Sequence, residues 1–221
     1  MDLLYTAHVP PGEGPFPTVL ALHGWGASAH DLLGLAPVLH GGQALVLCPQ
    51  GEVAFEVAPG MAGFGWWPIS PNRGIDPEAF GRAAASLRRF LDQACQRYPI
   101  DPRKIVAMGF SQGGVMATDL VLREPARFAG LIALSTWLPD VGAPPCSEPE
   151  ALKNLPVLLM HGSRDPMIPL ELARQARQKL LSLGMNVHYR EHEMQHEISP
   201  EALQELVAWL EEKVFNLIQL A

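Results

Sequence analysis

One serine in the chain stands where a serine can act as a nucleophile. The segment from Lys104 reads KIVAMGFSQGG, which places Ser111 at the centre of a Gly109-x-Ser111-x-Gly113 motif. An apolar run precedes the motif and a helical pattern follows it, and such a strand–turn–helix corner can hold a serine hydroxyl clear of a sheet. The flanking glycines let strand and helix approach without a Cβ clash. The motif predicts acyl transfer through Ser111, and a tight turn that merely contains a serine is the plainer alternative.

A serine hydroxyl is a weak nucleophile, so Ser111 needs a general base, and the base needs an acid that orients it. With this motif the partners follow along the chain in the order serine, acid, histidine. Asp165 comes shortly after an apolar run that ends in His161-Gly162. We therefore predict Asp165 as the acid. Asp140, which follows the preceding apolar run, is the competing candidate.

The base is expected beyond the last predicted strand, where His192 and His196 both fit by position. His196 lies just before Ser199-Pro200, in a loop that leads into the final predicted helix. A loop residue there can turn toward the serine, whereas His192 is still at the strand end, so His196 is the favoured base. His188 lies inside the strand and is interpreted as a half-exposed sheet residue.

Two backbone N–H groups are expected to bind the oxyanion of a tetrahedral intermediate. One belongs to the residue that follows the nucleophile, which is Gln112. The other should follow an early strand, where the His23-Gly24-Trp25-Gly26 segment offers the Trp25 amide. His23 is interpreted as a structural histidine beneath this turn rather than as a catalytic one.

Short apolar runs alternate with amphipathic stretches, which predicts βαβ units and an α/β fold with a mostly parallel sheet covered on both faces. Most of the runs are nearly continuous, as in strands buried on both faces. The predicted strands are Val19–Leu22, Ala44–Cys48, Ile105–Phe110, Leu131–Ser135 and Val157–His161, with Val187–Glu191 at one edge and Leu3–Val9 at the other. The predicted helices are Pro77–Tyr98, Gly114–Arg123, Glu171–Leu183 and Pro200–Leu217.

Two long segments, Gly51–Asp76 and Thr136–Asn154, are predicted as irregular loops because they are rich in glycine and proline. Loops of this length in a compact domain are usually functional. Ligands of parallel sheets bind beyond the carboxyl ends of the strands, where both loops begin. Trp66, Trp67 and Trp137 are therefore predicted as aromatic walls of a substrate site, with ordinary core packing as the alternative.

The composition excludes several classes of protein. The chain has 221 residues, 48% of them hydrophobic, which is enough for the core of a single domain over residues 1–221. Its formal net charge is −7 and its longest basic run is Arg88-Arg89, so nucleic-acid binding is not expected.

The cysteines and the N-terminal segment indicate in which cellular compartment the protein is expected. Cys48, Cys95 and Cys146 form no CxxC pair, which favours reduced thiols over a disulfide framework or a zinc cage. No basic residue precedes the first apolar residues, and no window of about 18 residues is uninterruptedly apolar. We therefore expect a soluble, cytoplasmic protein without a membrane span. The sequence leaves a homodimer open.

Taken together, these segments resemble the phospholipase/carboxylesterase family of α/β hydrolases, which includes the acyl-protein thioesterases. The matching segments read LHGWGAS from Leu22, WWP from Trp66, IDPRKIVAMGFSQGG from Ile100, ALSTWLP from Ala133, HGSRDPMIP from His161 and MQHEI from Met194.

The resemblance implies an α/β-hydrolase fold, a triad of Ser111, Asp165 and His196, and the Trp25 and Gln112 amides as oxyanion donors. It also implies that no cofactor is needed. No insertion is long enough for a large lid domain, which favours a small-molecule ester of short to medium acyl chain. A lysophospholipid or an acyl-protein thioester, cleaved by the same triad, is the alternative.

Two further alternatives belong to other classes of protein. His192-Glu193-Met194-Gln195-His196 satisfies the HExxH zinc signature, which works when both histidines share one helical face. Here a strand pattern leads into the motif and the next helix starts only at Ser199-Pro200, so a metal hydrolase is a remote alternative. A non-catalytic binding module is the other, and it is typical of chains in which a triad member is missing.

Overall fold

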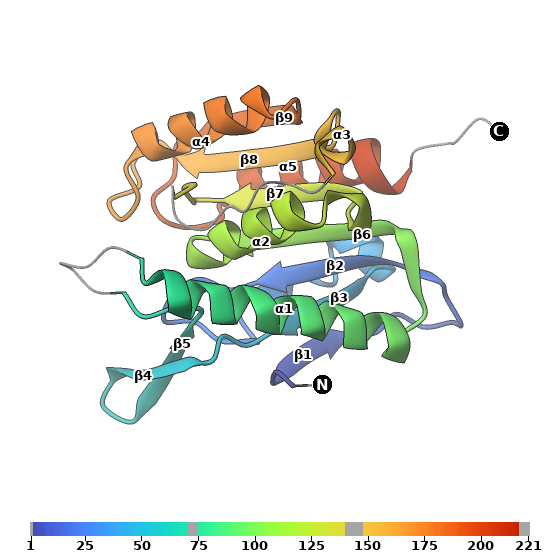
Figure 1. Cartoon of the computed structure of the whole chain (residues 1–221), viewed down its shortest axis with the longest axis horizontal. Helices are drawn as coiled ribbons and strands as arrows, with labels where there is room; N and C mark the ends of the chain where they lie inside the picture. The colour runs from blue at the N-terminus through green and yellow to red at the C-terminus, as the bar shows by residue number, and fades with distance from the viewer. Residues whose placement is uncertain (1, 70–74, 140–147, 217–221) are drawn as a thin grey trace.

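The central sheet places the ends of its parallel strands along one edge. The computed structural model describes residues 2–69, 75–139 and 148–216, and within them seven strands pair in the order β1-β3-β2-β6-β7-β8-β9 (Figure 1). The strands are β1 (Tyr5–His8), β2 (Phe16–Leu22), β3 (Leu45–Pro49), β6 (Ile100–Phe110), β7 (Gly130–Leu134), β8 (Pro156–Gly162) and β9 (Asn186–His192). Only β1 runs antiparallel to its neighbour.

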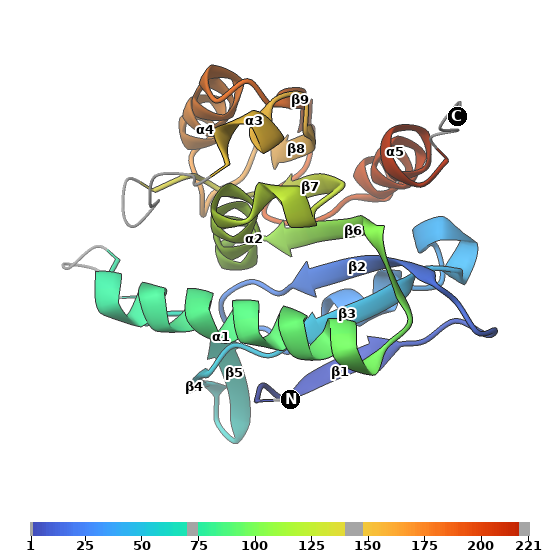
Figure 2. The same cartoon turned by 45° about the vertical axis from the view of Figure 1, so that its right-hand side comes forward.

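Helices cover both faces of this sheet (Figure 2). The α-helices are α1 (Pro77–Arg97), α2 (Gln112–Arg123), α3 (Pro149–Leu152), α4 (Leu170–Ser182) and α5 (Pro200–Leu210). Short 3-10 turns occur at η1 (Leu32–Leu35), η2 (Leu39–Gly42) and η3 (Pro125–Arg127), and a π-helical turn, η4 (Glu211–Phe215), extends α5. None of the helices in the described ranges is long and apolar enough to cross a bilayer.

Successive side chains of a strand point to opposite faces of the sheet, so each strand contributes side chains to two separate cores. Leu20 and Leu22 of β2 belong to the core that includes side chains of α1, α2 and α4, whereas Val19 and Ala21 belong to the core that includes side chains of η1, η2 and α5. All four side chains are at most 1% exposed. Burial on both faces explains why these strands read as unbroken apolar runs.

The predicted elements and the α/β class are confirmed. Each of the seven predicted strands and four predicted helices has a counterpart, and β1 and β9 are the two edges of the sheet as expected. Several boundaries differ by a few residues. The larger differences are that β2 begins at Phe16, β6 begins at Ile100, and α5 ends at Leu210 before the π-helical turn. Leu217, the predicted end of that helix, lies outside the described residues.

The prediction that Gly51–Asp76 is irregular is wrong. Residues Val53–Ala58 (β4) and Met61–Gly65 (β5) form an antiparallel hairpin that projects from the carboxyl edge of the sheet (Figure 1). Gly60 turns the hairpin with a φ of +73°. Glu56 interrupts the apolar residues of β4, and glycines interrupt those of β5, so neither strand has the continuous apolar run by which the buried strands were recognised.

The second long segment, Thr136–Asn154, contains the short helix α3. Its residues 140–147 lie outside the description, and with them Asp140 and Cys146. The structure therefore leaves the competing acid untested.

The cap of α5 yields a stability prediction. Ser199 is the N-cap, and its Oγ accepts the Ala202 N–H at 3.2 Å. Ser199→Ala leaves that donor unsatisfied and should lower the free energy of unfolding by about 1 kcal/mol. The melting temperature should fall by about 2–4 °C. Ser182→Ala, in the exposed last turn of α4, should change it by less than half as much, and equal losses in thermal denaturation would contradict the assignment.

Candidate active site

Ser111 occupies a sharp corner between β6 and α2. Its φ of 52° and ψ of −118° lie in a region that costs a non-glycine residue about 1–3 kcal/mol. Hydrogen bonds to the next strand hold this corner: the Ser111 N–H donates to the Leu134 carbonyl at 2.8 Å, and Thr136 Oγ1 donates to the Ser111 carbonyl at 2.7 Å. The conformation therefore depends on contacts from β7, which the sequence motif does not contain.

The two glycines of the motif are required by close backbone approach. A Cβ on Gly113 would lie 2.0 Å from the Leu22 carbonyl oxygen, and one on Gly109 would lie 2.1 Å from the Gly113 carbonyl oxygen. Neither backbone neighbour can move away as a flexible side chain could. This confirms the predicted reason for glycine on both sides of the serine.

Asp165 is held by the loop that follows β8. Its Oδ1 accepts the N–H groups of Met167 and Ile168 at 2.8 and 2.9 Å, and its Oδ2 accepts His196 Nδ1–H at 2.7 Å. Its side chain is fully shielded from solvent. Burial raises the pKa of the carboxyl, but these hydrogen bonds outweigh it and hold the pKa below its ordinary value. Asp165 is therefore ionised at neutral pH.

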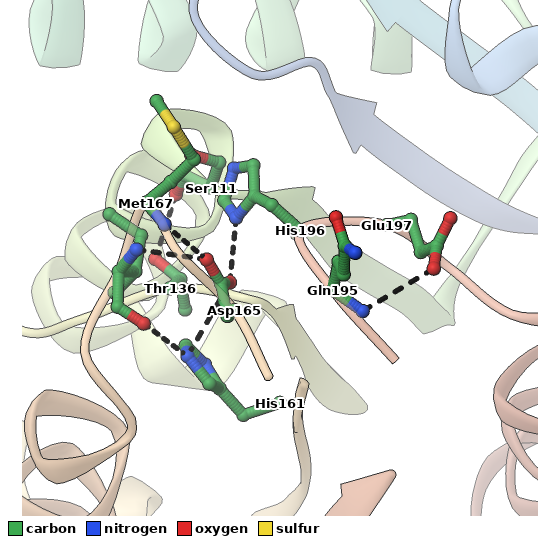
Figure 3. A network of polar contacts seen from close by, with 9 residues as sticks. Ser111, Thr136, His161, Asp165, Met167, Gln195, His196 and Glu197 are labelled. Carbon is green, nitrogen blue, oxygen red and sulfur yellow. Dashed lines mark hydrogen bonds and ion pairs between the residues drawn. The ribbon is translucent and has the colours of Figure 1, made fainter. Parts of the chain in front are cut away.

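His196 binds this carboxylate and lines one groove with Ser111. Because Nδ1 keeps its proton and donates it in the hydrogen bond to Asp165, the lone pair of the imidazole lies on Nε2, which can accept a proton. Figure 3 shows the ring hydrogen-bonded to Asp165 and lying beside Ser111. A groove of 460 Å³ is lined by both side chains, together with Gly24–Ala27, Asp31 and Phe110.

A residue that the sequence analysis did not single out supports the acid from below. The buried His161 donates from Nε2 to the Ile168 carbonyl at 2.9 Å, and the same atom lies 3.6 Å from Asp165 Oδ2 (Figure 3). This bond fixes the loop whose N–H groups hold the carboxylate. The histidine that ends the apolar run before Asp165 was the available signal.

The loop after β2 carries one of the predicted oxyanion donors. Among the described residues, the N–H groups of Trp25 and Gln112 have no protein hydrogen-bond partner, so both remain available to an anion. The hairpin fixes this loop: Gly26 N–H donates to the Phe64 carbonyl, and Phe64 N–H donates to the Ala27 carbonyl, each at 2.9 Å. The indole of Trp25 also stacks on Phe55 of β4, with ring centroids 4.1 Å apart.

Trp66 and Trp67, predicted as aromatic walls of the substrate site with core packing as the alternative, are core residues, 3% and 2% exposed, and are not among the described lining of the groove. Their backbones instead bind the side chain of Gln112. Its Oε1 accepts the Trp66 N–H at 2.8 Å, and its Nε2 donates to the Trp67 carbonyl at 2.9 Å. Trp137 is half-buried against the Trp67 ring and is not among the described lining of the groove.

His23 has the geometry of the structural histidine that was expected. Its Nδ1 bonds the Gly24 carbonyl at 2.8 Å, and its Nε2 accepts the Gly51 N–H at 3.0 Å. Burial lowers the pKa of the imidazole, which the hydrogen bond to Gly24 only partly offsets. Both ring nitrogens are thus occupied by backbone groups.

The two histidines of the HExxH sequence point to different partners. His192 ends β9 and its Nε2 lies 3.2 Å from Glu205 Oε2, whereas His196 lies in the following loop and binds Asp165. The helical face that a zinc site of this type requires is missing between them. In the described ranges, no three histidine, cysteine or acidic side chains are grouped to hold a metal ion.

Comparisons with known proteins show the family and agree with the fold. A family model described as phospholipase/carboxylesterase matches residues 6–214. Acyl-protein thioesterase 1 of Gibberella zeae is 27% identical over 89% of this chain and 90% of its own. The crystal structure of the Bacillus cereus carboxylesterase has a TM-score of 0.80 at 23% identity, over 96% of this chain and 95% of that one. Esterase PE8 has a TM-score of 0.79 at 26% identity, over 97% and 100%.

The lowered pKa of Asp165 predicts a pH-dependent contribution to stability. A carboxyl whose pKa is lower in the folded chain stabilises the fold above its unfolded pKa of about 4, and this contribution is lost as the pH falls through the folded value. Asp165→Asn lacks it at every pH. The difference in the free energy of unfolding between wild type and the variant should therefore be largest near pH 7, and it should become smaller below about pH 4. Urea titrations across this range measure the difference, and a constant difference would contradict the ionised pair.

The contact between hairpin and oxyanion loop yields a second prediction. A Cβ on Gly65 would lie 2.1 Å from Trp25 Cε3 and 3.0 Å from Gln112 Oε1. Gly65→Ala should displace the Trp25 amide and lower kcat by at least about tenfold, since loss of one oxyanion donor costs about 100-fold. Gly81→Ala on the exposed side of α1, where nothing lies within 4 Å, is the control and should leave kcat unchanged. Unchanged kcat in both variants would contradict the positioning role.

Proposed function

Since this chain belongs to the phospholipase/carboxylesterase family of α/β hydrolases, we propose that it hydrolyses short- to medium-chain acyl esters through an acyl-enzyme on Ser111. One observation carries the proposal: His196 Nδ1 binds the buried Asp165 carboxylate at 2.7 Å, while the same imidazole shares a groove with Ser111 on its strained corner. Acyl transfer needs an ionised acid that holds a base, and a free nitrogen on that base in the same groove as the serine.

The first half of the reaction forms the acyl-enzyme. Ser111 Oγ attacks the carbonyl carbon as His196 Nε2 takes its proton, and Asp165 stabilises the imidazolium that results. The carbonyl oxygen becomes an oxyanion and accepts the free N–H groups of Trp25 and Gln112. Gln112 opens α2, so the partial positive charge of the helix N-terminus adds to this stabilisation.

The second half releases the two products. The imidazolium of His196 gives its proton to the departing alkoxide oxygen, and the alcohol leaves. His196 then takes a proton from water, whose oxygen attacks the acyl carbon of Ser111. Collapse of this second intermediate returns the proton to Ser111 Oγ and frees the carboxylic acid.

Two features favour a small ester as the substrate. The groove at Ser111 has a volume of 460 Å³. The segment after β7 is too short to form a large lid domain of the kind that lipases use on emulsified fat. The second candidate is a thioester of an acylated protein, which the 27% identity to an acyl-protein thioesterase favours. The same triad would serve, because a thiolate is also a competent leaving group.

A cytoplasmic setting belongs to the same proposal. Cys48 and Cys95 are free thiols, as a reducing compartment would keep them. Cys48 is buried, and burial raises the pKa of its thiol to about 12, which makes it unreactive.

Replacing the nucleophile tests the proposal. Ser111→Ala should lower kcat by at least about 1000-fold on p-nitrophenyl esters from acetate to palmitate. The melting temperature should not fall, because the Ser111 hydroxyl makes no hydrogen bond recorded in the described ranges. Ser182→Ala, distant from the groove, is the matched control.

The chain-length profile separates the candidates. A maximum at short acyl chains supports the esterase, and a maximum at long chains moves the assignment to lysophospholipids or acylated proteins. Residual activity in Ser111→Ala above about one-tenth of wild type would reject this nucleophile. Folded wild-type protein that turns over none of the esters would favour the binding module.

A further inference from the structure

A second groove begins on the other side of His196. It has a volume of 270 Å³ and lies between η1 and the loop that leads into α5. It shares Asp31, Phe110 and His196 with the groove at Ser111, so the two are continuous. The residues lining it are Asp31, Leu32, Leu35, Phe110, His196, Glu197 and Ile198.

The chemistry of ester cleavage decides which half of the substrate this groove can receive, and this step rests on the proposed function. His196 must protonate the departing oxygen, so the leaving group has to extend past the imidazole. The carbonyl oxygen points the other way, toward the Trp25 and Gln112 amides. The second groove is lined by His196 and not by Ser111, which places it on the leaving-group side.

Apolar and acidic side chains divide the lining of this groove. Leu32 is buried, and Phe110, Leu35 and Ile198 are half-buried, which gives a surface that methyl groups can cover. Among the described lining residues, the negatively charged ones are Asp31 and Glu197, and both are exposed. Apart from His196, no described lining residue of either groove can carry a positive charge.

The two carboxylates are not neutralised by the protein. Among the described residues, neither Asp31 nor Glu197 forms an ion pair, and Glu197 accepts the Gln195 N–H at 3.3 Å. His23 interacts electrostatically with Asp31, but burial lowers the pKa of this imidazole and disfavours its charged form. Other acidic side chains of the same region are paired: Glu205 binds Arg190, and Glu191 binds Arg174. The groove therefore carries an uncompensated negative charge beside an apolar floor.

We infer that this groove is a leaving-group subsite for small cationic alcohols, such as those that end in a quaternary ammonium. The methyl groups of such a cation can cover the leucine and isoleucine side chains, and its charge is attracted by Asp31 and Glu197. The aromatic ring of Phe110 can add a cation–π contact. Anionic leaving groups are repelled by the same two carboxylates.

Two esters of matched shape test the inference. Butyrylcholine and 3,3-dimethylbutyl butyrate share their acyl group and differ in a quaternary nitrogen replaced by carbon. Because choline is the more acidic alcohol, each kcat/KM ratio of the cationic to the neutral ester is divided by the same ratio for hydroxide-catalysed hydrolysis. In wild type this corrected ratio should be at least about threefold in favour of the cationic ester at low ionic strength. The ratio should fall toward one in the Asp31→Asn/Glu197→Gln double variant, and in wild type at about 1 M salt.

The ratio separates substrate recognition from effects on the base. Any change in the basicity of His196 alters both esters alike, because the acyl group and the bond cleaved are the same. Glu13→Gln removes one negative charge from an exposed position in the connection between β1 and β2, and it should leave the ratio unchanged. A ratio of one or less in wild type overturns the inference, and so does a preference that survives in the double variant.

Two further outcomes separate this inference from the proposed function. If p-nitrophenyl butyrate is cleaved and neither alkyl ester is, inhibition of that reaction by choline and by 3,3-dimethylbutanol gives the same comparison. If folded protein cleaves no ester, the proposed function has failed, and NMR titration with the two alcohols still decides the subsite. Tighter binding of choline that is lost in the double variant supports it, and equal binding of the two alcohols overturns it.

Discussion

The close approach of α2 to the ends of β2 and β6 is the constraint on which the rest of the site depends. Gly113 touches the Leu22 carbonyl so closely that no Cβ fits, and this contact holds the helix N-terminus against the strand ends. Ser111 is thereby forced into a conformation that few non-glycine residues adopt. Bonds from β7 and from Thr136 offset the strain, so the corner exists only within the assembled sheet.

The charge of the buried Asp165 carboxylate places the second constraint on the site. Asp165 is shielded from water, and a buried carboxylate is costly unless it is hydrogen-bonded. Two backbone N–H groups and the His196 imidazole meet that requirement, and His161 fixes the loop that provides the backbone donors. One consequence is an imidazole whose Nδ1 is engaged by the carboxylate, which leaves Nε2 free to accept a proton. Structure and proton chemistry are therefore set by the same hydrogen bonds.

The hairpin β4–β5 connects the surface of the molecule to the candidate oxyanion site. Its Phe64 exchanges backbone hydrogen bonds with the loop that carries Trp25, and its Phe55 stacks on the Trp25 ring. Residues after the hairpin bind the Gln112 side chain from within the core. Both candidate donors are thus positioned by one segment. The Trp66 and Trp67 side chains of this segment are buried in the core, while their backbones bind Gln112.

The sequence by itself determined the order of the predicted strands and helices, the position of Ser111 between a strand and a helix, and the candidates Asp165 and His196. These features depend on local patterns: apolar periodicity, glycine spacing and position relative to strand ends. Tertiary structure alone decided the hairpin, the burial of Trp66 and Trp67, and the contact between Asp165 and His196. Each of these depends on segments far apart in the chain. No local pattern records which side chains meet, because that contact forms only when the sheet brings the segments together.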